Sequence, residues 1–339
     1  MKIIVLAFVF VISVSAAEAA EPLLLANDAW PPFILDGDDA GIAEQLVCEA
    51  LARADRGCEV KIEDWEVVLE QARSGAIDGI VAAWRTPGRE EFLLFSEPYL
   101  VNRIVAAVSV STPPEIQSAA DLAGKRVALV AGYVYGDEIA AMNGQFLEFT
   151  AKDALEAISL VLQGRADLAL VDELAGMEAL EASQITSVGL SKAVLATRDL
   201  HFALSTRNPE AEAIMQDFQR AYKAMLSDGT VNEILDIDWL ATDFGHQGEL
   251  EVVLRNDANL DQLNHPSKLG SVYSMGSARY PYDEEDAVDQ SRVKYQVKGK
   301  EHSDLQSALN SAFGTELGCE HNEYSSQFDC TKLFKKSKN

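Results

Sequence analysis

One structural unit occurs twice in this chain, and it restricts the possible folds more than any other feature. In each copy a helical stretch (66–73 and 154–163) ends at a glycine, and an apolar strand sequence follows almost at once. The linking segments are Gly75-Ala76-Ile77-Asp78 and Gly164-Arg165-Ala166-Asp167. Glycine is typical of the C-terminal end of a helix, since it adopts the left-handed conformation without strain. The alternation of strands and helices predicts an α/β fold with mostly parallel sheets. The repeat favours two similar lobes, although such glycine-capped loops are common in α/β proteins.

Length and composition are those of an ordinary soluble globular protein. The chain has 339 residues, of which 48% are hydrophobic and 24% are charged, and it is long enough for two or three domains. These values exclude wholesale disorder, collagen-like repeats and a polytopic membrane protein. Asp and Glu total 54 against 28 Lys and Arg, which gives a net charge of -26. Because so acidic a surface repels phosphate backbones, no nucleic-acid partner is expected.

The first 19 residues have the pattern of a secretory signal peptide. Lys2 precedes an apolar run from Ile3 to Val14, and Ala17-Glu18-Ala19 forms an A-x-A cleavage site. The apolar run is too short to span a bilayer, which disfavours the alternative of an N-terminal membrane anchor. No cysteine lies near the cleavage site, so a lipoprotein anchor is not expected.

Four cysteines form two local pairs, Cys48/Cys58 and Cys319/Cys330. Export makes disulfides chemically reasonable. Of the three possible connectivities, the sequence favours the two local bridges. A zinc site that includes His321 beside Cys319 is the alternative. The spacing fits no common zinc pattern, and an oxidising compartment disfavours free thiolates, so no metal is predicted.

The composition changes after about residue 243. Asn, Ser, Tyr, Gly and His become more frequent, and four of the five histidines lie in this part of the chain. One helix, from Asp304 to Phe313, and scattered strand candidates are expected here. The sequence therefore predicts a C-terminal extension over 243–339 of unknown, possibly α+β, structure. It is either a partner-binding module or a stabilising, partly disordered extension.

Short motifs follow one another in a specific order between residues 22 and 241. They are Trp30-Pro31-Pro32-Phe33, Gly41, Trp65, Gly75-Ala76-Ile77-Asp78, Thr86-Pro87-Gly88-Arg89, Phe95-Ser96-Glu97-Pro98-Tyr99, Gly124-Lys125-Arg126-Val127-Ala128-Leu129-Val130, Gly164-Arg165-Ala166-Asp167, Asp172 and Asp228-Gly229-Thr230. Each motif alone is weak, whereas their order and spacing are specific. Together they resemble the family 3 extracellular solute-binding proteins, which are the polar amino-acid receptors of ABC importers. The Cys48/Cys58 pair also falls where several family members carry a disulfide.

The resemblance implies a periplasmic-binding-protein-like fold, with two α/β lobes joined by two hinge strands. Lobe one would comprise 22–105 and 197–241, and lobe two 108–193. The ligand, an amino acid or similar zwitterion, would lie in the cleft and draw the lobes together. The resemblance implies a periplasmic monomer without a cofactor, and an inner-membrane ABC permease or a chemoreceptor as partner.

Two charged residues match the family positions that bind the α-amino acid group. Arg89 matches the arginine that holds the α-carboxylate, and a planar guanidinium pairs bidentately with a carboxylate. The alternative is a surface salt bridge with Glu90 or Glu91. Asp172 matches the aspartate that receives the α-ammonium, and it follows a buried strand, where ligands of α/β proteins bind. Its alternative role is to cap the next helix.

Aromatic residues match further family positions around the ligand. Trp30 and Trp65 match positions that sandwich the ligand side chain, where an indole face offers area and cation–π attraction. Their alternative role is ordinary core packing. Tyr133 and Val134 stand at a helix start, where family members usually offer hydroxyl groups and backbone N–H groups.

Other positions depart from the family pattern. Ala82 and Ala83 stand where several members have serines, so hydroxyl contacts to the ligand are reduced. Arg85 is either paired with a second acidic group of the ligand or directed to solvent. These departures leave the assignment to the binding-protein class in place. They disfavour an unmodified standard amino acid as the ligand.

Two other functions stay open. The family also includes cyclohexadienyl dehydratases, whose elimination of water requires a general acid in the cleft. Glu173 is the candidate acid, although a surface glutamate at a helix start is the simpler interpretation, and no enzyme activity is expected. The second alternative is a sensor or interaction protein that uses residues 243–339. No Ser-His-Asp order and no HExxH motif occurs in that extension.

Overall fold

A computed structural model describes residues 21–237, 239–242, 250–255, 272–275, 293–313, 320–321 and 328–329. The predicted signal peptide lies outside these ranges, as do Cys319 and Cys330, so both predictions stand untested. Within the described ranges, no helix has the length and apolar character needed to cross a membrane.

The main sheet has nine strands, in the order β2-β1-β3-β9-β5-β8-β6-β7, with β4 paired to β9. The strands are β1 (Leu23–Asn27), β2 (Cys58–Ile62), β3 (Gly79–Trp84), β4 (Leu93–Phe95), β5 (Leu100–Ser109), β6 (Arg126–Val130), β7 (Leu147–Ala151), β8 (Leu168–Asp172) and β9 (Val188–Ser205). β1 pairs in parallel with β2 and β3, and β6 pairs in parallel with β7 and β8. This confirms the predicted α/β architecture.

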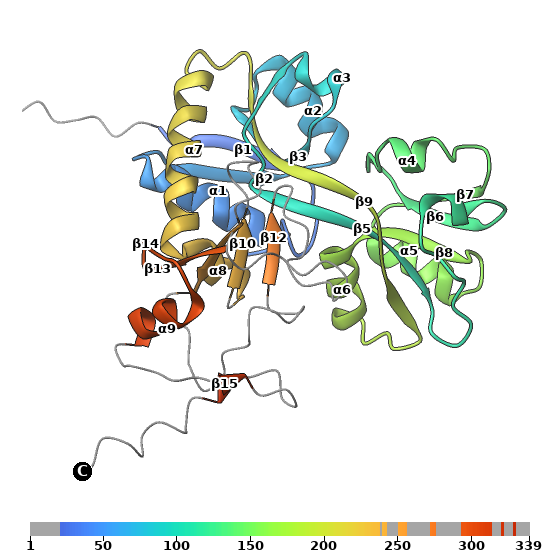
Figure 1. The fold of residues 1–339 in the computed structure, drawn as a ribbon. Coiled ribbons are helices and arrows are strands. Elements are labelled where there is room, and N and C mark those ends of the chain that lie inside the picture. The colour runs from blue at the N-terminus through green and yellow to red at the C-terminus, as the bar shows by residue number, and fades with distance from the viewer. Residues whose placement is uncertain are drawn as a thin grey trace, which may run out of the picture.

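Figure 1 shows that the sheet divides into two lobes, joined by the long antiparallel strands β5 and β9. One lobe carries β1–β4 with α1 (Ile42–Arg53), α2 (Trp65–Ser74), α3 (Pro87–Glu90) and α7 (Ala211–Asp228). The other carries β6–β8 with α4 (Asp137–Ala140), α5 (Ala154–Leu162) and α6 (Glu173–Ala182). We call them lobe one and lobe two. The two-lobed fold with two hinge strands is thus confirmed.

The repeated unit has the same structural role in each lobe. Gly75 and Gly164 have left-handed backbones, with φ of 79° and 68°, which end α2 and α5 respectively. The aspartate three residues later accepts a hydrogen bond from the backbone of the neighbouring parallel strand. Asp78 Oδ2 accepts from the Leu24 N–H, and Asp167 Oδ2 accepts from the Arg126 N–H, both at 2.8 Å. In each lobe, the aspartate of the repeated unit therefore ties the end of the helix to the adjoining strand.

A disulfide joins Cys48 of α1 to Cys58 of β2, as predicted. The ten-residue separation makes a short loop. Closing a loop of this length stabilises the folded state by about 2–3 kcal/mol, chiefly through the unfolded chain. The bridge also anchors β2, which is an edge strand of the main sheet.

A second sheet has five described strands in the order β12-β10-β11-β13-β14, and four of them belong to the C-terminal extension. They are β10 (Trp239–Thr242), β11 (Leu250–Leu254), β12 (Val272–Met275), β13 (Val293–Val297) and β14 (Lys300–His302). α9 (Leu305–Phe313) follows, in agreement with the one helix expected there. β15 (Glu320–His321) and β16 (Phe328–Asp329) form a separate antiparallel pair. β10 lies in the range that the resemblance assigns to lobe one, yet it pairs within this second sheet.

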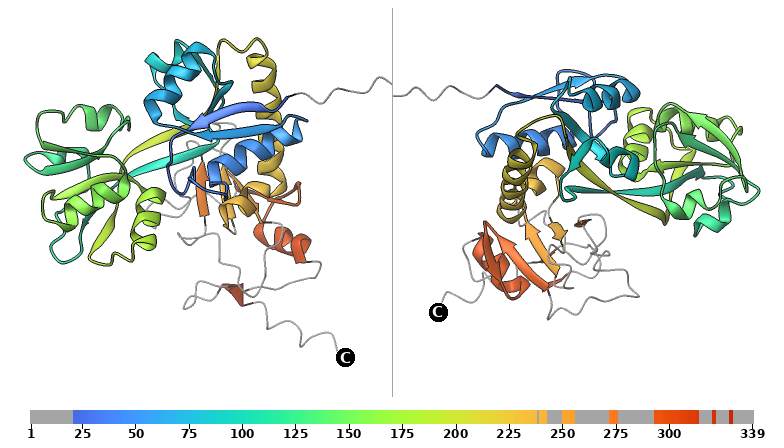
Figure 2. Two further views of the ribbon diagram at one scale, coloured as in Figure 1. Left: turned by 180° about the vertical axis from the view of Figure 1, so that it is seen from behind. Right: turned by 90° about the horizontal axis from the view of Figure 1, so that it is seen from above.

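The second sheet packs on lobe one, beside α7 and α8 (Thr230–Leu235), as both views of Figure 2 show. Trp239 is fully buried, and Leu240 and Val253 belong to the same hydrophobic core as the residues of α7. Asn232 of α8 donates a hydrogen bond from Nδ2 to the Val253 carbonyl, at 2.9 Å. The five-stranded second sheet is therefore an integral layer of lobe one.

Candidate functional site

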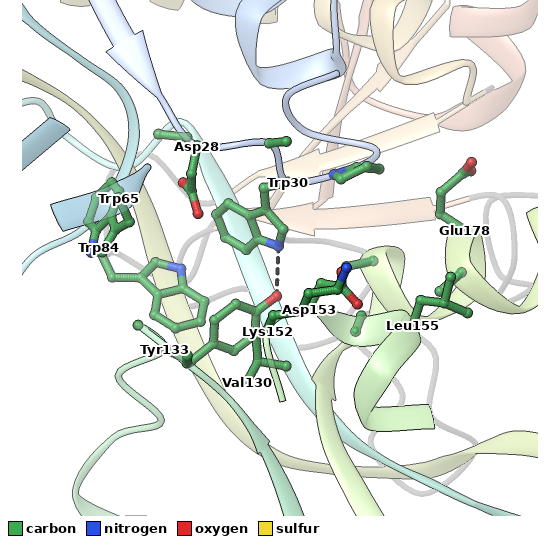
Figure 3. A pocket seen from close by; sticks show the side chains of 18 of the residues that line it. Asp28, Trp30, Trp65, Trp84, Val130, Tyr133, Lys152, Asp153, Leu155 and Glu178 are labelled. Atoms are coloured by element: carbon green, nitrogen blue, oxygen red, sulfur yellow. Dashed lines mark hydrogen bonds and ion pairs between the residues drawn. The ribbon is translucent and has the colours of Figure 1, made fainter. Parts of the chain in front are cut away.

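A cavity of about 380 Å³ lies between the lobes. Lobe one lines it from the end of β1, the following loop, α2, β3 and α3, and lobe two lines it from β6, α5 and α6. The lining residues used below are Asp28, Trp30, Trp65, Ala82, Ala83, Trp84, Arg89, Gly132, Tyr133, Lys152, Asp153, Leu155 and Glu178. Figure 3 shows the side chains that face it.

The loop after β1 holds Trp30 at the cavity. The backbones of Trp30 and Ile34 exchange two hydrogen bonds of 3.0 Å, and the Pro31–Pro32 peptide bond is cis. Gly41 allows α1 to begin directly against this loop, since a Cβ at Gly41 would lie 2.2 Å from the Phe33 carbonyl oxygen. The spacing of the Trp-Pro-Pro-Phe motif and Gly41 is thus explained by one tight backbone contact.

Three aromatic side chains from both lobes pack together beside the cavity. Trp30 Nε1 donates a hydrogen bond to the Tyr133 hydroxyl, at 2.7 Å, which links lobe one to lobe two. The ring of Trp84 lies edge-on to both, with centroid distances of 5.6 Å to Trp30 and 4.8 Å to Tyr133. Burial raises the pKa of Tyr133 well above its ordinary value, so the phenol stays neutral. We call Trp30, Trp84 and Tyr133 the aromatic trio.

Arg89 presents its guanidinium to the cavity from α3. Thr86 caps this helix by accepting the Arg89 N–H, and the guanidinium donates to the Trp84 carbonyl at 2.7 Å. Its carbon lies 4.8 Å from the centre of the Trp65 ring. Burial lowers the pKa of Arg89, which nevertheless stays charged. Within the described residues, Arg89 forms no ion pair with any carboxylate, and Glu90 pairs instead with Arg85.

Asp172 is buried at the end of β8, with 1% of its surface exposed. Its Oδ1 accepts the Ala175 N–H at 3.0 Å and so caps α6, and its Oδ2 accepts from Asn102 Nδ2 at 3.0 Å. Asn102 Oδ1 in turn accepts from Trp84 Nε1 at 2.8 Å. Asp172 is not among the residues that line the cavity. The helix-capping role is therefore present, and the aspartate is connected to the aromatic trio through Asn102.

A family model described as bacterial extracellular solute-binding proteins, family 3, matches residues 24–241. The chain belongs to this family. The resemblance noted over 22–241 is thereby confirmed.

Two relatives of this solute-binding protein are named L-cystine-binding proteins. The L-cystine-binding protein TcyJ of Escherichia coli (strain K12) is 27% identical over 220 residues, which cover 63% of this chain and 80% of TcyJ. The L-cystine-binding protein TcyA of Bacillus subtilis (strain 168) is 24% identical over 211 residues, which cover 60% of this chain and 76% of TcyA. A histidine kinase sensor domain with similarity to periplasmic binding proteins has a TM-score of 0.57 at 16% identity, and the match covers 64% of this chain and 96% of that domain. At that identity, the likeness concerns the fold alone.

The structure brings most of the predicted site residues of this solute-binding protein together. Six of them line the cavity: Trp30, Trp65, Ala82, Ala83, Arg89 and Tyr133. Three do not, namely Arg85, Val134 and Asp172. The side chain of Arg85 is 58% exposed and pairs with Glu90, so it is directed to solvent rather than to the cavity.

The candidate general acid of a dehydratase does not reach the cavity. Glu173, at the start of α6, forms an ion pair with Arg103 of the hinge strand β5 and is absent from the lining. This pairing gives the dehydratase alternative no support. In the part of the chain that the structure describes, no cluster of three or more His, Cys, Asp or Glu side chains is arranged to hold a metal.

The sequence predictions missed Asp28, which follows β1 and lines the cavity. Asn27 Nδ2 donates to Asp28 Oδ1 at 3.2 Å, while Asn27 Oδ1 accepts from the Ala82 N–H at 2.8 Å. Burial raises the pKa of Asp28, and the nearby charge of Arg89 acts in the opposite direction. Asp28 stands at the carboxyl end of a parallel strand, and this position is the sequence signal that could have identified it as a site residue.

The carboxyl of Asp172 makes stability depend on pH. Burial raises its pKa from 3.8 to about 6, so between these pH values the native state binds the proton more tightly than the unfolded state does. The contribution of this carboxyl to the free energy of unfolding is therefore largest below about pH 4. It falls between about pH 4 and about pH 6, and it is constant above about pH 6.

We expect the stability difference between wild type and Asp172→Asn to depend on pH. Asparagine also caps helices but does not titrate. Relative to the variant, wild type should lose about 2–3 kcal/mol of unfolding free energy between pH 4 and pH 7. Urea unfolding at both pH values measures this difference. Parallel pH profiles for the two proteins would contradict the raised pKa.

Proposed function

We propose that this protein captures a polar amino acid or a related zwitterion in the cavity between its lobes. The observation that carries the proposal is the guanidinium of Arg89, which faces the cavity without a carboxylate partner among the described residues. A ligand carboxylate would complete a bidentate pair with it. The names of the L-cystine-binding relatives support an amino acid as the class of ligand.

The lining groups around Arg89 suit the rest of such a ligand. Trp65 stacks on the guanidinium, and the Gly132 backbone of lobe two packs against the Trp65 ring, where a Cβ would lie 3.4 Å from Cδ1. A carboxylate on Arg89 would thus be held between elements of both lobes. We assign the ammonium of the ligand to Asp28, which lines the same cavity.

Asp172 stays a proposed ammonium ligand only for a conformation in which the aromatic trio has separated. In the structure described here, both of its oxygens accept hydrogen bonds from the protein, and the residue is almost fully buried. We propose that Asp172 positions Trp84 through Asn102 and so shapes the wall of the cavity. Val134 and Arg85 are given no ligand contact in this proposal.

We also propose that binding draws the lobes together about β5 and β9. The Trp30–Tyr133 hydrogen bond already joins the lobes at the cavity, and a ligand that contacts both lobes stabilises the closed arrangement by its differential affinity. The closed form would then deliver its ligand in the periplasm to an inner-membrane ABC permease or to a sensor.

Thermal unfolding of the mature protein, residues 20–339, against a panel of amino acids tests the proposed function. A ligand at a hundred times its Kd stabilises the native state by about 2.7 kcal/mol. At an unfolding entropy of about 2.1 cal/mol/K per residue, that corresponds to a rise in melting temperature of about 4 °C for a chain of this length. The matched controls are the methyl esters of the same amino acids, which lack the carboxylate and should give no shift. If no amino acid raised the melting temperature, or if the esters acted equally well, the proposal would be wrong.

A further inference from the structure

Aromatic rings enclose the part of the cavity that lies next to Asp28. Figure 3 shows the carboxyl of Asp28 directed into a space bordered by Trp30, Trp65, Trp84 and Tyr133. We call this space the aromatic compartment. Lobe one provides three of its four rings, and lobe two provides Tyr133. The cavity continues past the Trp30–Tyr133 hydrogen bond, where its walls carry Lys152, Asp153, Leu155 and Glu178.

The rings of the aromatic trio meet at steep angles, so they form separate walls instead of one stack. The ring planes of Trp30 and Trp84 are inclined by 84°, those of Trp84 and Tyr133 by 71°, and those of Trp30 and Tyr133 by 64°. Rings at such angles are arranged like the walls at the corner of a box. A compact cation placed in such a corner can contact the π faces of more than one ring.

Asp28 is the carboxylate of the aromatic compartment, and the side chains around it offer few other acceptors. Asn27 Nδ2 is the only group of another described residue that donates a hydrogen bond to the Asp28 carboxyl, which can therefore face a cation as well. Ala82 and Ala83 contribute methyl groups to the wall. The Tyr133 hydroxyl already accepts one hydrogen bond, across the lobes.

The number of acceptors distinguishes between two kinds of ammonium group. A primary ammonium has three N–H donors, and each donor that loses water without gaining an acceptor costs free energy. A trimethylammonium group has no N–H donor. Its positive charge lies behind methyl groups, which pack well on π faces and need only a carboxylate nearby. The aromatic compartment therefore suits a methylated ammonium better than a primary one.

We propose that the ligand is a betaine, that is, a zwitterion whose ammonium nitrogen carries three methyl groups. This inference rests on the proposed function of the cavity, with the ligand carboxylate on Arg89. The trimethylammonium group lies in the aromatic compartment, against the rings of the aromatic trio and beside the charge of Asp28. A primary amino acid uses the same two charged residues but binds more weakly, because its N–H groups lack acceptors.

Isothermal titration calorimetry of residues 20–339 with matched pairs of ligands tests this inference. The pairs are glycine, L-alanine and L-histidine, each compared with its Nα-trimethyl derivative. Within a pair, the carboxylate and the side chain are the same, and only the methylation differs. Wild type should bind at least one betaine about tenfold or more tightly than its parent amino acid. If no pair reached that preference, the inference would be overturned while the proposed function stands.

Two substitutions of Tyr133 test whether the ring itself binds the cation. Tyr133→Phe and Tyr133→Leu both remove the hydroxyl that accepts from Trp30, but only Tyr133→Leu removes the π face. Tyr133→Phe is therefore the matched control. Compared with Tyr133→Phe, Tyr133→Leu should bind the best betaine about five- to tenfold more weakly, and it should bind the parent amino acid within a factor of about two.

The outcomes separate this inference from the proposed function. Equal affinities of Tyr133→Phe and Tyr133→Leu for the best betaine would overturn the inference. An equal loss of affinity for the betaine and for its parent in Tyr133→Leu would overturn it as well. If wild type bound neither member of any pair, the proposed function itself would fall.

Discussion

Replacing Arg89 with alanine is expected to weaken amino acid binding by about 100-fold or more. A carboxylate that enters the cavity leaves water, and its charge must be matched by the guanidinium that faces it. Loss of one partner of such a desolvated pair costs about 3–5 kcal/mol, which corresponds to at least a hundredfold in affinity. Calorimetric titration of wild type and variant with the best ligand from the thermal panel measures the effect.

Two further variants separate the geometry of Arg89 from its charge and from general electrostatics. Arg89→Lys keeps the charge but cannot form the bidentate pair, so we expect an intermediate loss of about tenfold. Arg85→Ala removes a nearby arginine that is exposed and paired with Glu90, and it should bind like wild type. Equal affinities for wild type and Arg89→Ala, or equal losses in Arg85→Ala and Arg89→Ala, would contradict the assignment of the carboxylate site.

Asn102→Ala is expected to destabilise the protein by about 3–5 kcal/mol, because it leaves two buried groups without their partner. The side chain is 1% exposed and connects Trp84 Nε1 to Asp172 Oδ2 across the hinge strand β5. Above pH 6 the Asp172 carboxylate is charged, so the loss of its hydrogen-bond donor is the larger part of the effect. Urea unfolding at pH 7 measures the change in unfolding free energy.

Asn143→Ala serves as the control for Asn102→Ala, since Asn143 is exposed in the turn that follows α4. Its effect should remain within about 0.5 kcal/mol. The destabilisation of Asn102→Ala should also be smaller at pH 4, where Asp172 is protonated in the native state and has less charge to satisfy. A loss below about 1 kcal/mol at pH 7 would show that the Trp84–Asn102–Asp172 network is not important for stability.

The elements that the sequence predicted well are those that local rules determine. The glycines at 75 and 164 end helices, and the aspartates three residues later bind the neighbouring strand, so a four-residue pattern reports a complete helix–strand junction. The Cys48–Cys58 bridge spans ten residues and was likewise accessible from spacing. The positions of Trp30, Trp65 and Arg89 at one cavity followed from the ordered motifs and the resemblance that they carry.

What the sequence did not reveal depends on contacts between distant segments. Asn102 and Asp172 are 70 residues apart, and no local pattern marks Asn102 as the group that takes up one oxygen of the aspartate. The second sheet was not predicted either. A long stretch of changed composition separates β10 from β13 in the sequence, whereas in the sheet β11 lies between these two strands.

The two interpretations of Asp172 illustrate the same limit. A carboxylate at the end of a buried strand is suited to binding a ligand and to capping the next helix, and the sequence allows both. The structure shows the cap, the bond from Asn102 and the burial, all of which follow from the packing of lobe two against β5. Asp28 occupies the comparable strand end in lobe one, and unlike Asp172 it lines the cavity.

A crystal structure of residues 20–339 with the amino acid that gives the largest thermal shift tests the central claim most directly. We predict that the ligand lies between the lobes, with its carboxylate on the Arg89 guanidinium and its ammonium within hydrogen-bonding distance of Asp28. Trp65 should contact the same end of the ligand. A ligand bound outside this cavity, or bound within it with its carboxylate away from Arg89, would contradict the account.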